Sequence, residues 1–93
     1  MIYVLIERRI AEGMATTYDE SARDMLQQTY AVPGFISGEA YEDMADNNHR
    51  FLLCKWRTSR DWQKWLHSAE RAELINRFAP ILQEPEKITL LAV

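Results

Sequence analysis

The sequence predicts a single α+β domain in which one four-stranded antiparallel sheet carries its helices on one side. The chain has 93 residues, which is enough to bury one core and too few for two. Short runs rich in β-branched and aromatic residues lie near both ends and in the middle, and helix-spaced apolar stripes lie between them. The resulting order, β-α-β-β-α-α-β, is the split β-α-β arrangement. No repeat or linker interrupts residues 1–93, so we expect one domain.

The N-terminal third predicts a strand followed by a helix. Residues 2–9 open with Ile-Tyr-Val-Leu-Ile, a run typical of a strand. Thr17, with Glu20 three residues later, forms the pattern of a capping box at a helix start. Apolar residues at helical spacing then extend to about Tyr30, where we expect the helix to end.

The next segment predicts a second strand. Pro33 and Gly34 break the helix and turn the chain, and residues 35–43 alternate in the manner of a strand. This alternation places Phe35, Glu39 and Tyr41 on the same face.

The second half of the chain predicts a hairpin, two helices and a last strand. Residues 45–49 have polar turn chemistry, so residues 50–57 are expected to return as the third strand. Ser59 can cap a first helix, and a second helix follows Ser68 and ends at Pro80. The last strand is expected over residues 87–93.

Composition argues against several classes of protein. The net charge is -3, without the concentrated lysine and arginine that nucleic acids or anionic membranes require. We therefore expect no nucleic-acid partner and no membrane partner. Cys54 is the single cysteine and cannot form an internal disulfide, which favours a reducing cytoplasm, and we interpret it as a core residue. Two distant histidines and three scattered glycines predict no metal site and no nucleotide cofactor.

Both faces of the predicted sheet are apolar. The first strand carries Val4 and Ile6 on one side and Tyr3 and Leu5 on the other. A sheet with one face in water should alternate apolar and polar residues. If about six large side chains stayed exposed to water, the protein would lose about 1.5–3 kcal/mol of burial free energy for each of them. The sum is comparable to the whole stability of a small domain. We therefore expect a second copy of the sheet to cover this face in a homodimer.

Several short motifs occur in a characteristic order on the predicted elements. They are Val32-Pro33-Gly34-Phe35, Trp56 at the end of the third strand, Ser59 with Asp61-Trp62, Trp65-Leu66 and Ser68-Ala69-Glu70-Arg71. In this order the chain resembles the antibiotic biosynthesis monooxygenase domain over nearly its whole length. The resemblance implies a dimeric α/β barrel of ferredoxin-like subunits, with a pocket between each sheet and its helices.

The resemblance is incomplete at the residues that carry chemistry. The branch that oxidises aromatic phenols with O₂, without metal or flavin, has a Trp at the position of Trp56. The same branch has Asn, Tyr and His where this chain has Leu52, Trp62 and Tyr41. The haem-degrading branch has its Trp at Trp65 but an axial His where Ile75 stands, so the resemblance implies no iron ligand there.

The candidate site is therefore aromatic. Trp56, Trp62 and Trp65 can form a wall for a planar substrate, although such a stripe is also typical of plain core packing. Glu39, if half buried, can act as a base, although strand carboxylates are more often exposed. His67 lies off the tryptophan stripe, which favours a surface position.

Three functions remain open from the sequence. The first is a cofactor-independent monooxygenase or related oxidoreductase that acts on a small aromatic or quinone-like molecule. Its expected catalytic residues are Trp56 and Glu39, and its expected substrate-binding residues are Tyr41, Trp62, Trp65, Leu52 and Ile75. The second is a non-catalytic dimeric module that binds an apolar small molecule. The third is an assembly subunit without a ligand, for which the pocket would be filled by the protein's own side chains.

Overall fold

The computed structural model describes all residues from Met1 to Val93. Its elements are β1 (Ile2–Arg9), α1 (Ala15–Thr29), β2 (Phe35–Asp43), β3 (Asp46–Trp56), α2 (Ser59–Leu66), α3 (Ala69–Phe78), a short 3₁₀ helix η1 (Ala79–Ile81) and β4 (Lys87–Ala92). This order confirms the predicted β-α-β-β-α-α-β arrangement. None of the helices combines the length and the apolar character that a membrane span requires.

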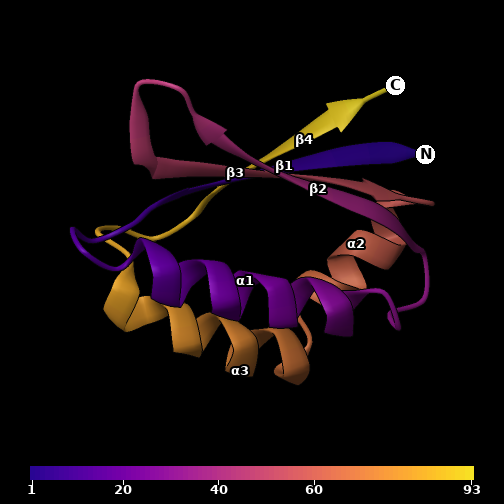
Figure 1. The fold of residues 1–93 in the computed structure, drawn as a ribbon. Helices are drawn as coiled ribbons and strands as arrows, with labels where there is room; N and C mark the ends of the chain where they lie inside the picture. The colour runs from indigo at the N-terminus through magenta and orange to yellow at the C-terminus, as the bar shows by residue number, and fades with distance from the viewer.

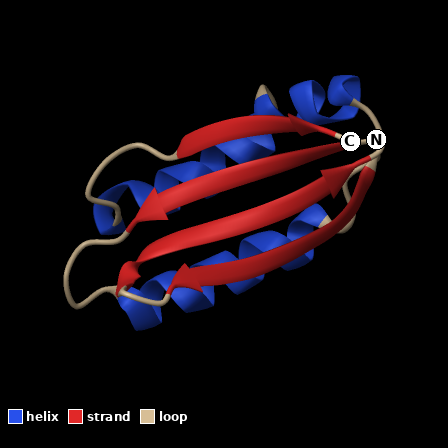
Figure 2. Cartoon of the chain, turned by 90° about the horizontal axis from the view of Figure 1, so that it is seen from above, coloured by secondary structure: helices blue, strands red, loops and turns tan.

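The four strands form one antiparallel sheet in the order β2-β3-β1-β4. The N-terminal and C-terminal strands are therefore neighbours, although they are separated by most of the chain. Figure 1 shows α1 and α3 side by side beneath the sheet, with α2 at the end where both termini lie. In Figure 2 the sheet lies in front of the helices. The face of the sheet that points away from the helices, toward the viewer, carries no element of this chain. The predicted α+β, ferredoxin-like fold is confirmed.

Two helix starts differ from the prediction. The first helix begins at Ala15, and the residue before it, Met14, makes no side-chain cap. The capping box expected at Thr17 is therefore wrong, because this residue already lies inside the helix. The second helix is capped by Thr58, whose hydroxyl accepts the backbone N–H of Asp61 at 3.1 Å, and not by the adjacent Ser59. The third helix follows Ser68 as expected, and the Ser68 hydroxyl caps it by accepting the backbone N–H of Arg71.

The hairpin between β2 and β3 is tighter than the sequence suggested. The carboxylate of Asp43 accepts the N–H of Ala45 at 2.8 Å, and that of Asp46 accepts the N–H of Asn48 at 2.9 Å. These local hydrogen bonds satisfy the turn, so pairing resumes at Asp46 and β3 starts four residues earlier than expected.

A β-bulge corrects the predicted faces of β2. The register shifts between Phe35 and Ser37, so Ile36 is an extra residue in the ladder. Phe35 turns toward the helices, where its ring meets the ring of Trp56 edge-on with centroids 5.2 Å apart. Glu39 and Tyr41 pair with residues on the opposite, uncovered face. The expectation that these two share a face with Phe35 is wrong, because strict alternation fails across a bulge.

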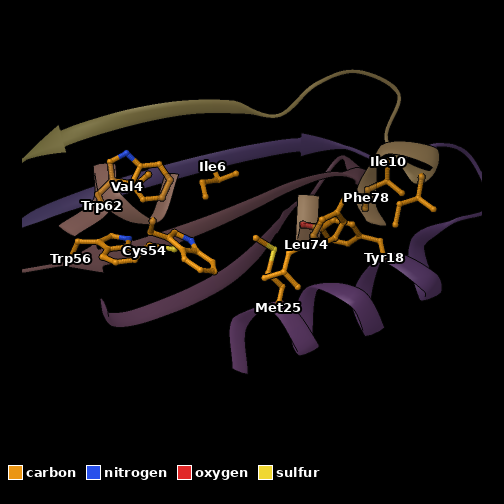
Figure 3. Packing of buried hydrophobic residues seen from close by; sticks show 12 residues of the cluster. Val4, Ile6, Ile10, Tyr18, Met25, Cys54, Trp56, Trp62, Leu74 and Phe78 are labelled. Carbon is orange, nitrogen blue, oxygen red and sulfur yellow. The ribbon is translucent and has the colours of Figure 1, made fainter. Parts of the chain in front are cut away.

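The core lies between the sheet and the helices. Val4, Trp56, Trp62 and Phe78 are almost completely buried. Figure 3 shows two groups of side chains, with Trp56, Trp62 and Cys54 at one end and Tyr18, Phe78 and Ile10 at the other. Ile6 lies between the two groups in this view. The tryptophan end coincides with α2, which therefore closes that end of the layer.

The uncovered face of the sheet is apolar at its centre. Leu5 on β1 lies opposite Leu53 on β3, and Tyr3 lies opposite Leu91 on β4. Tyr41 and Leu91 are 52% and 40% exposed. The predicted apolar character of both faces is therefore confirmed, and this face offers a surface for association.

Candidate functional site

A cavity of about 290 Å³ lies between the sheet and the helices. This volume is at the lower end of the range for small-molecule sites. Thirteen of the nineteen residues around the cavity are apolar, and they come from β1, β2, β3, α1 and α2. The site therefore has the largely apolar character of a small-molecule pocket.

Three tryptophans form one wall of the cavity. Trp56 ends β3, and Trp62 and Trp65 lie three residues apart on α2, so all three face the same space. The rings of Trp56 and Trp62 meet at 64° with centroids 5.7 Å apart. All three side chains are buried. This wall gives the cavity an aromatic side against which a planar molecule can pack.

The floor of the cavity comes from β3. Leu52 and Cys54 lie two residues apart on the strand and both border the cavity. Burial raises the pKa of the Cys54 thiol to about 12, although the charges of Arg8 and Arg71 act in the opposite direction. The thiol is therefore protonated at neutral pH, and its predicted role as a core residue is supported over that of a nucleophile.

The remaining sequence-predicted site residues do not point into the cavity. Tyr41 is among the residues that border it, but its side chain is 52% exposed on the uncovered face and donates its hydroxyl to the carboxylate of Glu39. This hydrogen bond raises the pKa of Tyr41. Glu39 itself does not border the cavity, because the bulge turns it to the uncovered face. Ile75 packs against the core from α3 without reaching the cavity, and His67 is exposed as expected.

A buried ionic cluster forms a second wall, next to the tryptophans. Arg8 on β1 and Arg71 on α3 both border the cavity, with side chains 2% and 6% exposed. Glu86, which precedes β4, accepts from Arg8 Nε at 3.1 Å and from Arg71 Nη2 at 2.5 Å. Arg8 Nη1 also donates to the hydroxyl of Tyr18 at 3.1 Å. Burial lowers the pKa of Arg8, but Tyr18 and Glu86 outweigh this effect, and the net pKa is raised.

Four buried side-chain donors find no acceptor in the chain. They are Arg8 Nη2, Arg71 Nε, Trp56 Nε1 and Trp62 Nε1. All four belong to residues that border the cavity. Each unpartnered buried donor costs free energy, so such groups are rare in native proteins and call for an explanation.

Sequence reasoning missed this ionic cluster although part of the signal was present. Arg8 has the same strand parity as Val4 and Ile6, which face the helices. Arg71 lies three and seven residues before Leu74 and Phe78, on the buried face of α3. An arginine that shares the spacing of the buried apolar residues of its strand or helix is expected to be buried with them. A buried cation requires a charged or polar partner.

The structure contains no group of three or more His, Cys, Asp or Glu side chains that could hold a metal ion. The ionisable side chains around the cavity are arginines, tyrosines, one cysteine and one aspartate. The cavity therefore offers hydrogen-bond donors and positive charge to whatever it holds.

Solved structures share this fold over the whole chain. A putative antibiotic biosynthesis monooxygenase from Nitrosomonas europaea has a TM-score of 0.88 at 16% identity and covers 100% of this chain and 98% of its own. One from Bordetella bronchiseptica has a TM-score of 0.90 at 12% identity, with coverage of 99% and 95%. SnoaB, a cofactor-independent oxygenase from Streptomyces nogalater, has a TM-score of 0.88 at 9% identity, with coverage of 99% and 91%. At these identities the likeness establishes the fold, and not the activity.

A comparison with curated proteins gives no significant match. The sequence profile described as "Antibiotic biosynthesis monooxygenase" matches residues 1–77, which is most of the chain. This match includes the strands and helices that build the cavity, from β1 through most of α3. The chain therefore belongs to the antibiotic biosynthesis monooxygenase family.

Proposed function

We propose that this protein is a small-molecule oxidoreductase that oxidises an aromatic or quinol-type substrate with O₂ in the tryptophan-lined cavity. The observation that carries the proposal is the cavity itself, a largely apolar space of about 290 Å³ with Trp56, Trp62 and Trp65 on one wall. Similarity to SnoaB, a cofactor-independent oxygenase, supports the reaction class. The arrangement suits a planar ring, which can pack against the indoles.

The reaction balances without an external reductant. In the first reaction, the CH₂ group between the two aromatic rings of an anthrone-like phenol is oxygenated. This carbon loses its two hydrogens and gains one oxygen atom as a carbonyl. The second oxygen atom of O₂ leaves as water, with the two hydrogens. Oxidation of a hydroquinone instead yields a quinone and hydrogen peroxide, so peroxide analysis separates the two reactions.

The residues of the cavity have defined parts in this proposal. Trp56, Trp62 and Trp65 hold the ring and exclude water, and Leu52 shapes the floor. Tyr41 borders the cavity, but its side chain lies beside Glu39 on the uncovered face, so we assign it no contact with the substrate. We assign no proton transfer to Glu39, because it lies on the other face of the sheet. The substrate therefore enters as its anion or loses its proton to solvent at the rim.

The alternative function is a binding module without catalysis. The same cavity supports it, since the tryptophan wall gives shape without chemistry and Cys54 stays protonated at neutral pH. An assembly subunit without a ligand is disfavoured, because the cavity is not filled by the protein's own side chains.

We also propose that the uncovered face of the sheet joins two copies of this chain. The central residues Leu5 and Leu53 are apolar and lie opposite each other across β1 and β3. A second copy of the same face buries them without any new element. The free, buried thiol of Cys54 supports a reducing location such as the cytoplasm.

The test is O₂ uptake by the purified protein over a panel of anthrone-like phenols and hydroquinones. We expect saturable uptake with one O₂ consumed per substrate. Ala22 borders the cavity from α1, so Ala22→Phe should block both binding and turnover. Ala72 is exposed on α3 and does not border the cavity, so Ala72→Phe is the matched control and should keep full activity.

A second variant addresses catalysis at Trp56. Trp56→Phe keeps an aromatic ring but removes the indole N–H, so we expect slower turnover with binding retained. Saturable binding without turnover on every compound would reject the enzyme and leave the binding module. Equal activity of Ala22→Phe and the native protein would show that the cavity is not the site.

A further inference from the structure

We propose that the cavity selects an organic anion, with a planar apolar body against the tryptophans and a carboxylate or phenolate head group at Arg8 and Arg71. This inference rests on the proposed function for the existence of a ligand, and it names the chemical class of that ligand.

The charge around the cavity is opposite to that of the chain. The protein has a net charge of -3, yet the cavity is bordered by four arginines and one aspartate. Half of the eight arginines in the sequence are gathered there. Asp19 is paired with Arg50 at 2.5 Å, so these two charges offset each other, and Arg8, Arg23 and Arg71 remain. The field inside the cavity therefore favours an anion.

The ionic cluster is short of one negative charge. Arg8 and Arg71 share the single carboxylate of Glu86, and each of the three side chains is at most 10% exposed. Buried charges are ordinarily matched by partners, because an uncompensated charge in a low-dielectric interior is costly. One anionic oxygen group bound here would balance the cluster.

Four unpartnered donors belong to the residues of the same two walls, and each donor atom is itself buried. Arg8 Nη2 and Arg71 Nε lack acceptors at the ionic wall, and Trp56 Nε1 and Trp62 Nε1 lack them at the aromatic wall. An anion brings acceptors and no donors, which complements such a site, whereas an amine or an ammonium ion brings further donors. Arginine also binds carboxylates strongly through charge-assisted hydrogen bonds.

The geometry places head and body next to each other. The guanidinium of Arg71 lies 5.5 Å from the ring centre of Trp62, so the ionic wall and the aromatic wall meet at this contact. A ring that packs on the tryptophans therefore has its substituent within reach of a cation. Exposed Arg23 borders the same cavity, where it can attract an anion from solvent.

The first experiment uses the native protein and pairs of probes that differ only in charge. Benzoate, 1-naphthoate and 2-naphthoate are each compared with the matching carboxamide by tryptophan fluorescence and calorimetry. We expect at least one carboxylate to bind about 10- to 100-fold more tightly than its amide, as is typical of hydrogen bonds to charged groups. In a parallel titration, bound 2-naphthol should show the absorbance of the naphtholate at a lower pH than the free compound if the head group is a phenolate.

Variants then locate the preference. Arg71→Gln should remove the preference for the carboxylate, and it leaves Arg8 and Glu86 as a neutral pair that the fold can accommodate. Arg60 is exposed on α2 and does not border the cavity, so Arg60→Gln should change neither affinity. Glu86→Gln should strengthen carboxylate binding, because it removes the competing anion. A cluster with a purely structural role would not produce this gain.

The outcomes separate this inference from the proposed function. Equal binding of every carboxylate and its amide, with no shift in the naphthol titration, overturns the anion site and leaves a site for neutral small molecules. A carboxylate preference that survives in Arg71→Gln also overturns it. If no probe binds and the O₂-uptake panel is silent as well, both this inference and the proposed function are wrong.

Discussion

The buried cluster of Arg8, Glu86 and Arg71 predicts an unusual order of stabilities. Its formal charge is +1, so removing the carboxylate leaves two buried cations, whereas removing one arginine leaves a neutral pair. Breaking a buried ion pair costs about 3–5 kcal/mol, and Glu86→Gln should fall near 3 kcal/mol because the amide oxygen still accepts a hydrogen bond. For a domain of this size that corresponds to a decrease in Tm of roughly 12–24 °C.

Arg8→Met should cost much less. It loses the hydrogen bonds to Glu86 and to Tyr18, both at 3.1 Å, but it also removes one unpartnered donor and the repulsion between the two arginines. Methionine keeps the apolar contact with the Phe78 ring, which lies 4.6 Å from the guanidinium. We expect a net loss of about 1 kcal/mol in the free energy of unfolding.

Urea unfolding at pH 7, followed by tryptophan fluorescence, measures both variants. Glu84 is the matched control, since its carboxylate is 59% exposed and pairs with exposed Arg9 at 3.5 Å. Glu84→Gln should change the free energy of unfolding by less than about 0.5 kcal/mol. If Glu86→Gln is as stable as Arg8→Met, the cluster does not carry an uncompensated positive charge, and the reasoning is refuted.

Three further predictions concern other parts of the molecule. Burial raises the pKa of Cys54 from 9.0 to about 12, so the folded state holds the proton more tightly than the unfolded state. Its contribution to stability is complete below pH 9 and falls as the pH rises toward 12, by at most about 1.4 kcal/mol per pH unit. The free energy of unfolding, measured by chemical denaturation between pH 9 and 12, should lack this contribution to its pH dependence in Cys54→Ala. Gly34 has a φ of +89°, and a Cβ there would overlap the side chain of Asp61, so Gly34→Ala should cost about 2–3 kcal/mol in thermal unfolding. Gly13 has a φ of +79° and no neighbour within 4 Å of the added Cβ, so Gly13→Ala should cost about 1 kcal/mol. If the two variants lost equal free energy of unfolding, an overlap with Asp61 would be contradicted. Leu53→Lys on the uncovered face should halve the mass measured by light scattering, and a native protein that is monomeric at micromolar concentration would disprove the dimer.

The identity and order of the elements could be predicted because their signals are local. The run from Ile2 and the stripe of Trp62 and Trp65 reflect residue spacing alone, which fixes strand or helix before any tertiary contact forms. The tryptophans were expected at the candidate site for the same reason, and the structure places them together at the cavity. The capping box at Thr17 failed because the chain enters the helix earlier, after the turn at Gly13.

The faces of β2 could not be predicted from alternation. One extra residue at Ile36 reverses every side chain beyond it, which moved Glu39 away from the cavity and turned Phe35 toward Trp56. A bulge is decided by the pairing of β2 with β3 and by packing against the helices, and neither is visible in the order of residues within one strand.

By itself the sequence determined the fold, the family and the aromatic wall, since these follow from periodicity and from short motifs. Only the tertiary structure decided the electrostatic character of the site. Arg8 and Glu86 are 78 residues apart in the chain, and they meet because β1 and β4 are neighbours in the sheet. Arg71 joins them from α3. Charges that are separated in the sequence show no pattern until the fold removes them from water and forces them to be matched.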